Sequence, residues 1–216
     1  MNNRFSQWCL VSLTCVMFSG CAQIIALNQS YDVQKVKKVA VLGFAGLQDF
    51  PSVGTSVFNE FNFALLQHGF NAVEPSFIQQ TLADQKLEKA ASIDVESIRK
   101  VGKVMGTDAV IIGSVQMFRP EGKAEVYTPA AANQSKSGAY ELADVPAQSK
   151  PVSGKVEKAM ISVAFRMIDV NTGEIVASGS NDAKGADGLQ ASKNVSRGLV
   201  KELRKQFDAV LAKRKI

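Results

Sequence analysis

Few side chains in this sequence have the chemistry that catalysis or metal binding requires. His68 is the only histidine, so a Ser-His-Asp triad or a multi-histidine metal site has almost no material. It lies beside Gly69 near the end of an expected helix, where a polar side chain is ordinary. Asp169 and Glu174 flank an expected hairpin turn, where carboxylates are commonly solvated turn residues. We therefore expect no enzyme, no cofactor and no bound metal.

The three cysteines, Cys9, Cys15 and Cys21, all lie in the first 21 residues. A polar start with Arg4, the apolar run "WCLVSLTCVMF" and small residues before Cys21 have the layout of a secretory signal peptide over residues 1–20. The run is too short to span a membrane, which takes about 20 apolar residues. Removal of the signal would leave one cysteine, so neither disulfides nor thiol catalysis is expected.

The motif "FSGC", Phe18 to Cys21, resembles the lipobox of bacterial lipoproteins, with Phe18 where leucine is commoner. The resemblance implies that Cys21 carries a diacylglyceryl thioether, that the signal is cut before it, and that the new amino terminus is acylated. Ala22, in place of aspartate, implies sorting to the outer membrane, on its periplasmic face. Several acyl chains on one residue make a durable anchor. The alternative is an ordinary secretory signal with a chance cysteine near its cleavage site.

The glycine-rich loop "GFAGLQDFPSVGTS" joins an expected strand to an expected helix. Its Gly43, Gly46 and Gly54 meet neither G-x-G-x-x-G nor G-x-x-x-x-G-K-[ST], and no lysine follows Gly54 to reach a phosphate. The glycines are expected to let the chain turn tightly, so we predict no nucleotide or other small-molecule substrate. The formal net charge of +5 is modest and spread thinly, and without a basic, aromatic-laced face it predicts no nucleic-acid partner.

Hydrophobic patterning predicts a single α/β (α+β) domain over residues 37–216, joined to Cys21 by a tether of residues 21–36. A chain of 216 residues, 46% of them hydrophobic, can bury one sizeable core. The expected elements are a strand at 39–44, a helix at 51–69, a short strand at 70–75, helices at 76–87 and 94–106, a strand at 107–118, a hairpin at 158–180, and a long C-terminal helix. Together they predict helices covering a mixed sheet of about four or five strands.

Local signals fix the ends of several of these elements. Ser76 and Gln79 have the spacing of a capping box, and Asp94 is an expected N-cap. The continuous apolar run at 107–118 is typical of a central strand covered on both faces. In the hairpin loop "NTGE", Gly173 can take a positive φ. These signals predict where the chain turns.

Two basic or irregular segments leave alternatives open. Residues 119–158 carry four prolines among small and polar residues, which predicts a long mobile surface loop. The loop either contacts a partner or is a disordered segment without a binding role. The C-terminal "KELRKQFDAVLAKRKI" has an apolar stripe and six basic side chains, so it could lie on an anionic membrane. We expect instead that the stripe packs on the sheet and the basic end complements the helix dipole.

Several stretches together resemble the curli production assembly/transport (CsgG) family of outer-membrane lipoproteins. They are "KKVAVLGF", "FALLQHGFNAVEP", "IRKVGKVMGTDAVIIGSV" and "ISVAFRMIDVNTGEIVAS", and they run from about residue 37 to 180, with the final helix added. The "GKVMGTDAVIIGSV" junction and the "RMIDVNTGEIV" hairpin are the most specific. The resemblance implies a fold like an anticodon-binding domain, which also occurs in LpoB-type activators of peptidoglycan synthases and in the amino-terminal domain of TolB.

The resemblance implies a non-enzymatic subunit that works by assembly with envelope or secretion proteins, including copies of itself, in curli-type or related surface-structure export. Two alternatives stay open. An LpoB-like activator would need a long spacer, whereas residues 22–35 reach roughly 50 Å at full extension. A pore subunit of that family inserts two hairpins into the outer membrane, yet only about a dozen residues separate residue 180 from the expected last helix, and each spanning strand needs about 9 to 11.

Overall fold

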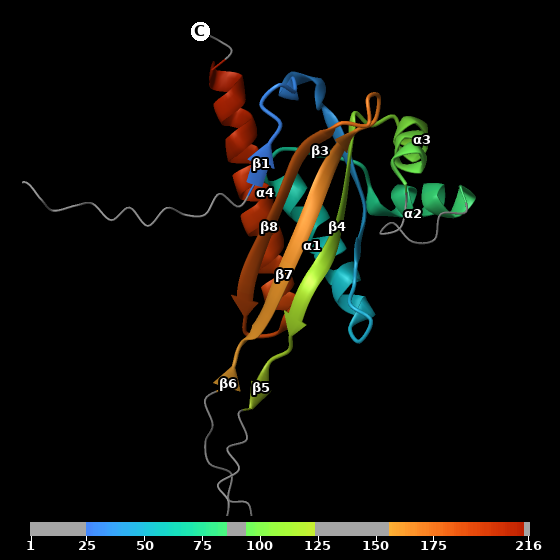
Figure 1. Cartoon of the computed structure of the whole chain (residues 1–216). Helices are drawn as coiled ribbons and strands as arrows, with labels where there is room; N and C mark the ends of the chain where they lie inside the picture. The colour runs from blue at the N-terminus through green and yellow to red at the C-terminus, as the bar shows by residue number, and fades with distance from the viewer. Residues whose placement is uncertain (1–24, 86–93, 124–155, 214–216) are drawn as a thin grey trace, which may run out of the picture.

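The computed structural model describes residues 25–85, 94–123 and 156–213. Its main sheet has six strands in the order β1-β8-β7-β4-β2-β3, and a second ladder pairs β5 with β6. The elements are β1 (Ile25–Leu27), the 3-10 helix η1 (Val33–Lys35), β2 (Lys38–Ala45), α1 (Pro51–Gln67), β3 (Asn71–Ala72), α2 (Pro75–Asp84), α3 (Val95–Met105), β4 (Ala109–Arg119), β5 (Gly122–Lys123), β6 (Val156–Glu157), β7 (Ala159–Asp169), β8 (Ile175–Gly185) and α4 (Gly188–Lys213). Figure 1 shows α1 and α4 behind the sheet.

The sheet is mixed, as predicted. β2 runs parallel to β3 and β4, whereas β4, β7, β8 and β1 pair antiparallel in turn. The sixth strand is β1, which the sequence analysis did not expect. The α+β fold class is confirmed, because the described residues form four α-helices around an open sheet.

The main core lies between the sheet and the layer formed by α1 and α4. Strand alternation sends one set of side chains to this face, and the apolar stripes of both helices close over it. Phe61 of α1 lies at its centre, with its ring centroid 5.0 Å from that of Phe44 and 5.6 Å from that of Phe165. The predicted stripe of α4 packs here, because Val195, Leu199, Leu203 and Phe207 are all buried. The prediction that this stripe packs on the sheet is confirmed.

A smaller second core covers only one end of the opposite sheet face. There α2 and α3 bury Ile78, Ile98 and Met105 against the side chains of Val110 and Ile112 of β4. Beyond Ile112 no helix continues over this face in the described ranges, and the side chain of Gln116 is exposed. The prediction of a central strand covered on both faces therefore holds only for the first half of β4, because α2 and α3 pack over that end of the sheet alone.

The predicted tether of residues 21–36 is wrong for the part that the structure describes. Ile25 and Leu27 are buried and pair, in β1, with Gly179 and Ala177 of β8. Val33 is also buried, against the main core. Ile25 and Leu27 are buried and Ala26 between them is exposed, which is the alternation of a strand with one buried face. The pattern is too short, and its neighbours too polar, for the sequence to predict this strand.

Three predicted boundaries also differ. α2 is capped by Glu74, with Pro75 at its first turn, and not by Ser76, whose backbone N–H and hydroxyl both donate to the Glu74 carboxylate. β8 continues to Gly185 and α4 begins at Gly188. Residues 181–192, expected to link strand and helix, are thus mostly strand and helix themselves. The N-cap prediction for Asp94 is confirmed, since its carboxylate accepts from the backbone of Ser97 at 3.0 Å.

The predicted loop at 119–158 begins and ends in the short ladder of β5 and β6, and residues 124–155 lie outside the described residues. Gly122–Lys123 and Val156–Glu157 are therefore strand, in a ladder close to the neighbouring ends of β4 and β7. Across the ranges that the structure describes, no helix is both long enough and apolar enough to cross a membrane.

Candidate functional site

Cys21, the predicted lipidation site, lies outside the described residues, four positions before Ile25. Four residues extend a chain by roughly 14 Å at most. Whatever is attached to Cys21 is therefore held close to the β1 edge of the sheet. The chain then crosses one end of the sheet between β1 and β2, and this crossing contributes to a cluster of polar and charged side chains.

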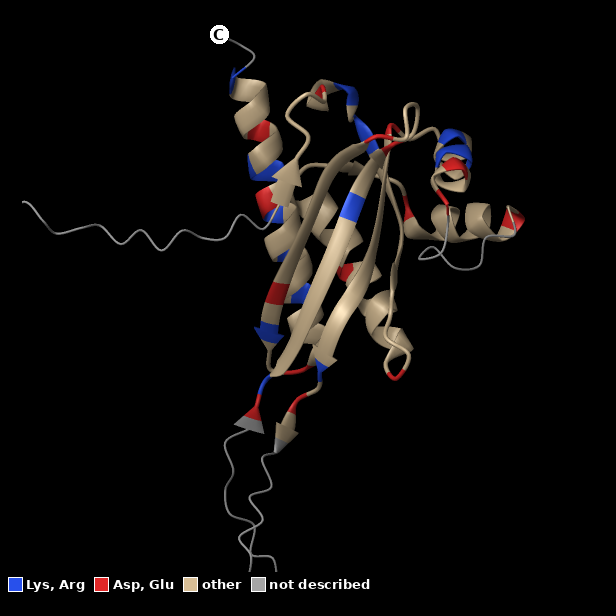
Figure 2. Ribbon diagram, viewed as in Figure 1, with Lys and Arg blue, Asp and Glu red and all other residues tan. Residues whose placement is uncertain are grey.

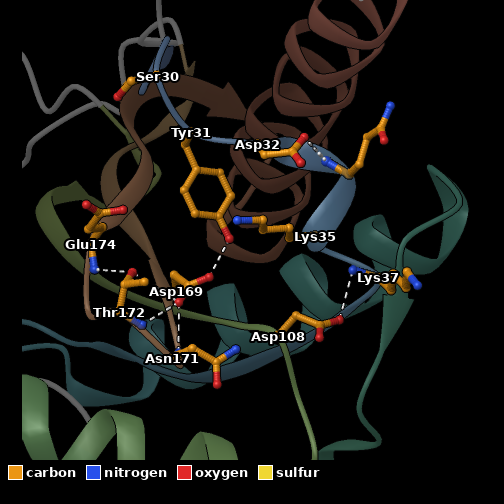
Figure 3. A pocket seen from close by; sticks show the side chains of 11 residues that line it. Ser30, Tyr31, Asp32, Lys35, Lys37, Asp108, Asp169, Asn171, Thr172 and Glu174 are labelled. Carbon is orange, nitrogen blue, oxygen red and sulfur yellow. Dashed lines mark hydrogen bonds between the residues drawn. The ribbon is translucent and has the colours of Figure 1, made fainter.

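The cluster lines an open pocket of about 620 Å³ between the β1–β2 connection and the β7–β8 turn (Figure 3). Tyr31 and Lys35 come from the connection, Asp108 precedes β4, and Asp169 and Thr172 come from the turn. The three segments that carry these residues are far apart in the sequence, and the order of the strands in the sheet brings them together.

Asp169 is the centre of the cluster, and its side chain accepts hydrogen bonds on both oxygens. Its Oδ1 accepts from the backbone N–H groups of Asn171, at 2.8 Å, and Thr172, at 2.6 Å, and from the Thr172 hydroxyl at 3.1 Å. Its Oδ2 accepts from the hydroxyl of Tyr31. With 4% of its surface exposed, Asp169 is a buried turn anchor. The prediction of a solvated turn residue is wrong for it.

Burial and hydrogen bonding together shift the pKa values of both partners. Burial raises the pKa of the Asp169 carboxyl, but the hydrogen bonds donated by Tyr31, Thr172 and Asn171 outweigh burial, so the pKa is lowered overall. Burial first, and then the hydrogen bond to Asp169 and its negative charge, raise the pKa of the Tyr31 hydroxyl. Tyr31 thus stays a neutral donor and Asp169 a charged acceptor across the physiological range.

The neighbouring groups hold the chain in the same way. Asp108 Oδ2 accepts from the backbone N–H of Lys37 at 2.9 Å and of Lys38 at 2.8 Å, which fixes the start of β2. On the other side of the β7–β8 turn, Arg99 of α3 donates to the carbonyl of Asn171 at 2.6 Å. Gly173, with φ of 79°, takes the left-handed conformation predicted for it. The turn is therefore held from both sheet faces.

The hydrogen bonds of this cluster hold the backbone in place, and they leave its two buried or bonded carboxylates little capacity for catalysis. Asp169 and Asp108 are engaged by backbone and hydroxyl donors, and Glu174 is exposed. His68 is the C-cap of α1, as expected, and its backbone N–H donates to the carbonyl of Ala64. No three His, Cys, Asp or Glu side chains within the described ranges are placed to hold a metal ion. The hydrogen bonds around the pocket fasten the β1–β2 connection to the β7–β8 turn and to the start of β4.

Sequence reasoning missed Tyr31 altogether and misjudged Asp169. The spacing of Asp169 to Asn171 and Thr172 is that of an Asx turn, a local signal that could have predicted a bonded carboxylate. No local signal predicts Tyr31, because its partner lies 138 positions away in the sequence.

The chain matches the family model "Curli production assembly/transport component CsgG" over residues 44–199. No curated protein matches its sequence. Solved structures similar to it include the PelC dodecamer from Paraburkholderia phytofirmans (15% identity, 82% of this chain and 96% of that one, TM-score 0.48), lipoprotein GNA1162 from Neisseria meningitidis (16%, 82% and 98%, 0.43) and the LpoB C-terminal domain from Salmonella enterica (12%, 69% and 83%, 0.40). At these identities and scores we draw no functional conclusion from the likeness.

Proposed function

The chain belongs to the CsgG family of curli production assembly/transport components, and from that premise we propose that it is a non-enzymatic accessory subunit of an envelope or secretion complex. Cys21 carries its lipid anchor and the folded domain faces the periplasm from the outer membrane. The observation that carries the proposal is the family match over residues 44–199, which runs from the end of β2 into α4. Self-assembly with further copies belongs to the same proposal.

The short link between Cys21 and β1 supports an accessory role close to the membrane. Because Ile25 is already buried in the sheet edge, the domain cannot extend far from its anchor. An activator that must reach a peptidoglycan synthase across the periplasm needs a long spacer, and the stretch available here is shorter than the sequence predicted. The activator alternative therefore loses support.

The anchor is tested by replacing Cys21 with Ala in the full chain. We expect the natural chain to fractionate with membranes and to show a mass shift from acyl groups on its first mature residue, and Cys21→Ala to lose both. Cys15→Ala, in the predicted signal, is the matched control and should behave as the natural chain. A bare Cys21 in the purified mature chain would contradict the proposal.

The accessory role is tested by cross-linking in intact membranes, followed by native mass spectrometry of the extracted complexes. We expect cross-links to other envelope proteins, to further copies of the chain, or to both. A chain that stays monomeric and captures no envelope protein would count against the role, while stimulation of a purified peptidoglycan synthase would favour the activator instead.

A further inference from the structure

We infer that the outer face of the α1–α4 layer is a docking surface for an anionic phospholipid membrane. The inference rests on the proposed lipid anchor, and it adds which face of the domain the membrane meets. Two features of the described residues, a row of cations and exposed apolar side chains, converge on this face, and the proposed anchor at Cys21 supplies the third. We call this face the helical face and define it by Phe63 and Leu66 of α1 and by Arg197, Lys201 and Lys205 of α4.

The first feature is the row of cations on α4. Arg197, Lys201 and Lys205 are exposed and four residues apart, so they form one ridge opposite the buried stripe of the helix. Figure 2 shows basic positions recurring along this helix. Within the described ranges, Arg197 and Lys201 have no ion pair, whereas Lys205 is 3.4 Å from a carboxylate oxygen of Glu202. The ridge therefore presents a net positive surface.

The acidic groups of the two helices weaken this surface little. Glu202 is already shared between Lys205 and the amide of Gln206, which donates to it at 2.9 Å. Asp208 pairs with Arg204 at 3.1 Å. Glu60 is the only carboxylate within α1, and it is partly buried. The helical face keeps an excess of positive charge, which attracts an anionic lipid surface through each Lys or Arg near it.

The second feature is the pair of exposed apolar side chains on α1. Phe63 is 52% exposed and Leu66 is 60% exposed, and both lie away from the side of α1 that buries Phe61 and Leu65. The end of α1 lies beside the last turns of α4, because the ring of Phe70, three residues beyond α1, packs 5.7 Å from that of Phe207. Cations beside exposed aromatic and aliphatic groups are typical of surfaces that lie in a lipid interface.

The third feature is the anchor. Cys21 lies within roughly 14 Å of Ile25 along the chain, and β1 and η1 both contact α4. A bilayer that holds the acyl groups is thus never far from α4, so even weak attraction acts at a high effective concentration. The anchor supplies the proximity, while the cations and apolar side chains select the face that turns toward the lipid.

The test uses the lipidated mature chain, whose Cys21 is blocked, with an environment-sensitive fluorophore on an introduced cysteine. Leu66→Cys reports on the helical face. Val104→Cys is the matched control, because Val104 is 54% exposed on α3, which covers the opposite sheet face. Vesicles contain phosphatidylcholine with or without about 30 mol% phosphatidylglycerol, which gives the vesicle surface a negative charge. A spin-labelled lipid quenches the fluorophores that reach the bilayer.

We expect the label at Leu66→Cys to be quenched at least about twofold more than the label at Val104→Cys, and only with phosphatidylglycerol present. Adding R197E, K201E and K205E should lower the docked-to-undocked ratio by about fivefold or more per cation and bring both labels to the same level. Salt at about 1 M should act in the same direction, since it shortens the screening length to roughly 3 Å. Circular dichroism confirms that the triple variant stays folded.

Equal quenching at the two positions, or quenching that ignores both phosphatidylglycerol and the three charge reversals, would overturn the inference. If the helical face instead binds an acidic protein, the charge reversals will abolish a cross-link to that protein and leave lipid quenching unchanged, which also overturns it. Failure of the lipid anchor is a separate result, because it appears as an unmodified Cys21 in the mass spectrum before any vesicle is added.

Discussion

At the scale of single residues, the bond between Tyr31 and Asp169 determines how the first described segment is attached. The hydroxyl and the carboxylate are both buried, so each would be costly to leave without a partner. The bond joins the β1–β2 connection to the β7–β8 turn, and with it the segment next to Cys21 to the centre of the sheet. The β1–β2 connection, which the sequence predicts to be a tether, is therefore part of the fold.

Replacing Tyr31 with Phe should lower the free energy of unfolding by about 1 to 3 kcal/mol, because a buried charged acceptor loses a donor. Urea unfolding followed by circular dichroism measures the change. The same substitution in an Asp169→Asn background should cost clearly less, since the charged acceptor is then absent. Equal costs in both backgrounds would show that the Tyr31 hydroxyl contributes through other contacts.

The lowered pKa of Asp169 predicts the direction of an acid effect. Because the pKa of its carboxyl is lower in the folded chain than in the unfolded one, its charged form stabilises the fold above the unfolded pKa of about 3.9, and this contribution disappears as pH falls through the folded pKa. The stability difference between the natural chain and Asp169→Asn should therefore shrink as pH drops below about 4. Glu174→Gln, at an exposed neighbour, is the control. A difference that is constant down to pH 2 would refute the prediction.

At the scale of elements, β1 turns a predicted tether into a sheet edge. The strand is short, but Ile25 is fully buried and Leu27 nearly so. Its pairing with β8 also covers part of an edge that would otherwise present free backbone groups. The element thus shortens the flexible link and extends the main core at once.

Ile25→Ala should destabilise the domain by about 2 to 5 kcal/mol, as large-to-small changes in a core do. Ala26→Ser, one position on and exposed, should leave stability within about 0.5 kcal/mol of the natural chain. Thermal and urea unfolding measure both. If Ile25→Ala proves as harmless as Ala26→Ser, the segment behaves as the tether that the sequence predicted.

At the scale of the whole molecule, the two sheet faces are unequal. The main core joins the sheet to α1 and α4, whereas the smaller one joins only an end of the sheet to α2 and α3. The helical face, η1 and the larger core all belong to the same side. This division separates the side that we infer meets the membrane from a sheet face over which, among the described residues, no helix continues beyond Ile112.

Hydrogen exchange should reveal this inequality. Amides of α3 are expected to exchange faster than those in the middle of α4, because fewer buried contacts must open to expose them and local stability follows local burial. Mass spectrometry of peptides from residues 95–105 and 195–207 compares the two helices directly. Equal protection in both would indicate that the domain opens only as one unit.

Local patterns in the sequence were enough for most of the elements. The alternation in β7, the apolar run of β4 and the stripe of α4 each reflect a period that backbone geometry imposes, so they can be recognised without knowing the neighbours. The N-cap at Asp94 and the turn glycine Gly173 depend on contacts within a few residues, so the sequence predicts them as well. The family resemblance, drawn from the same stretches, is confirmed by the match over residues 44–199.

The tertiary structure alone decided the features that depend on distant partners. Tyr31 finds Asp169 only because β8 lies between β1 and β7, and Ile25 is buried only because α4 returns along that edge. Likewise, α4 by itself has an apolar stripe and a basic ridge, and the sheet determines which of the two remains in solvent. The period of a helix or strand can be recognised from neighbouring residues. Pairing across the fold depends instead on packing between segments that lie far apart in the sequence.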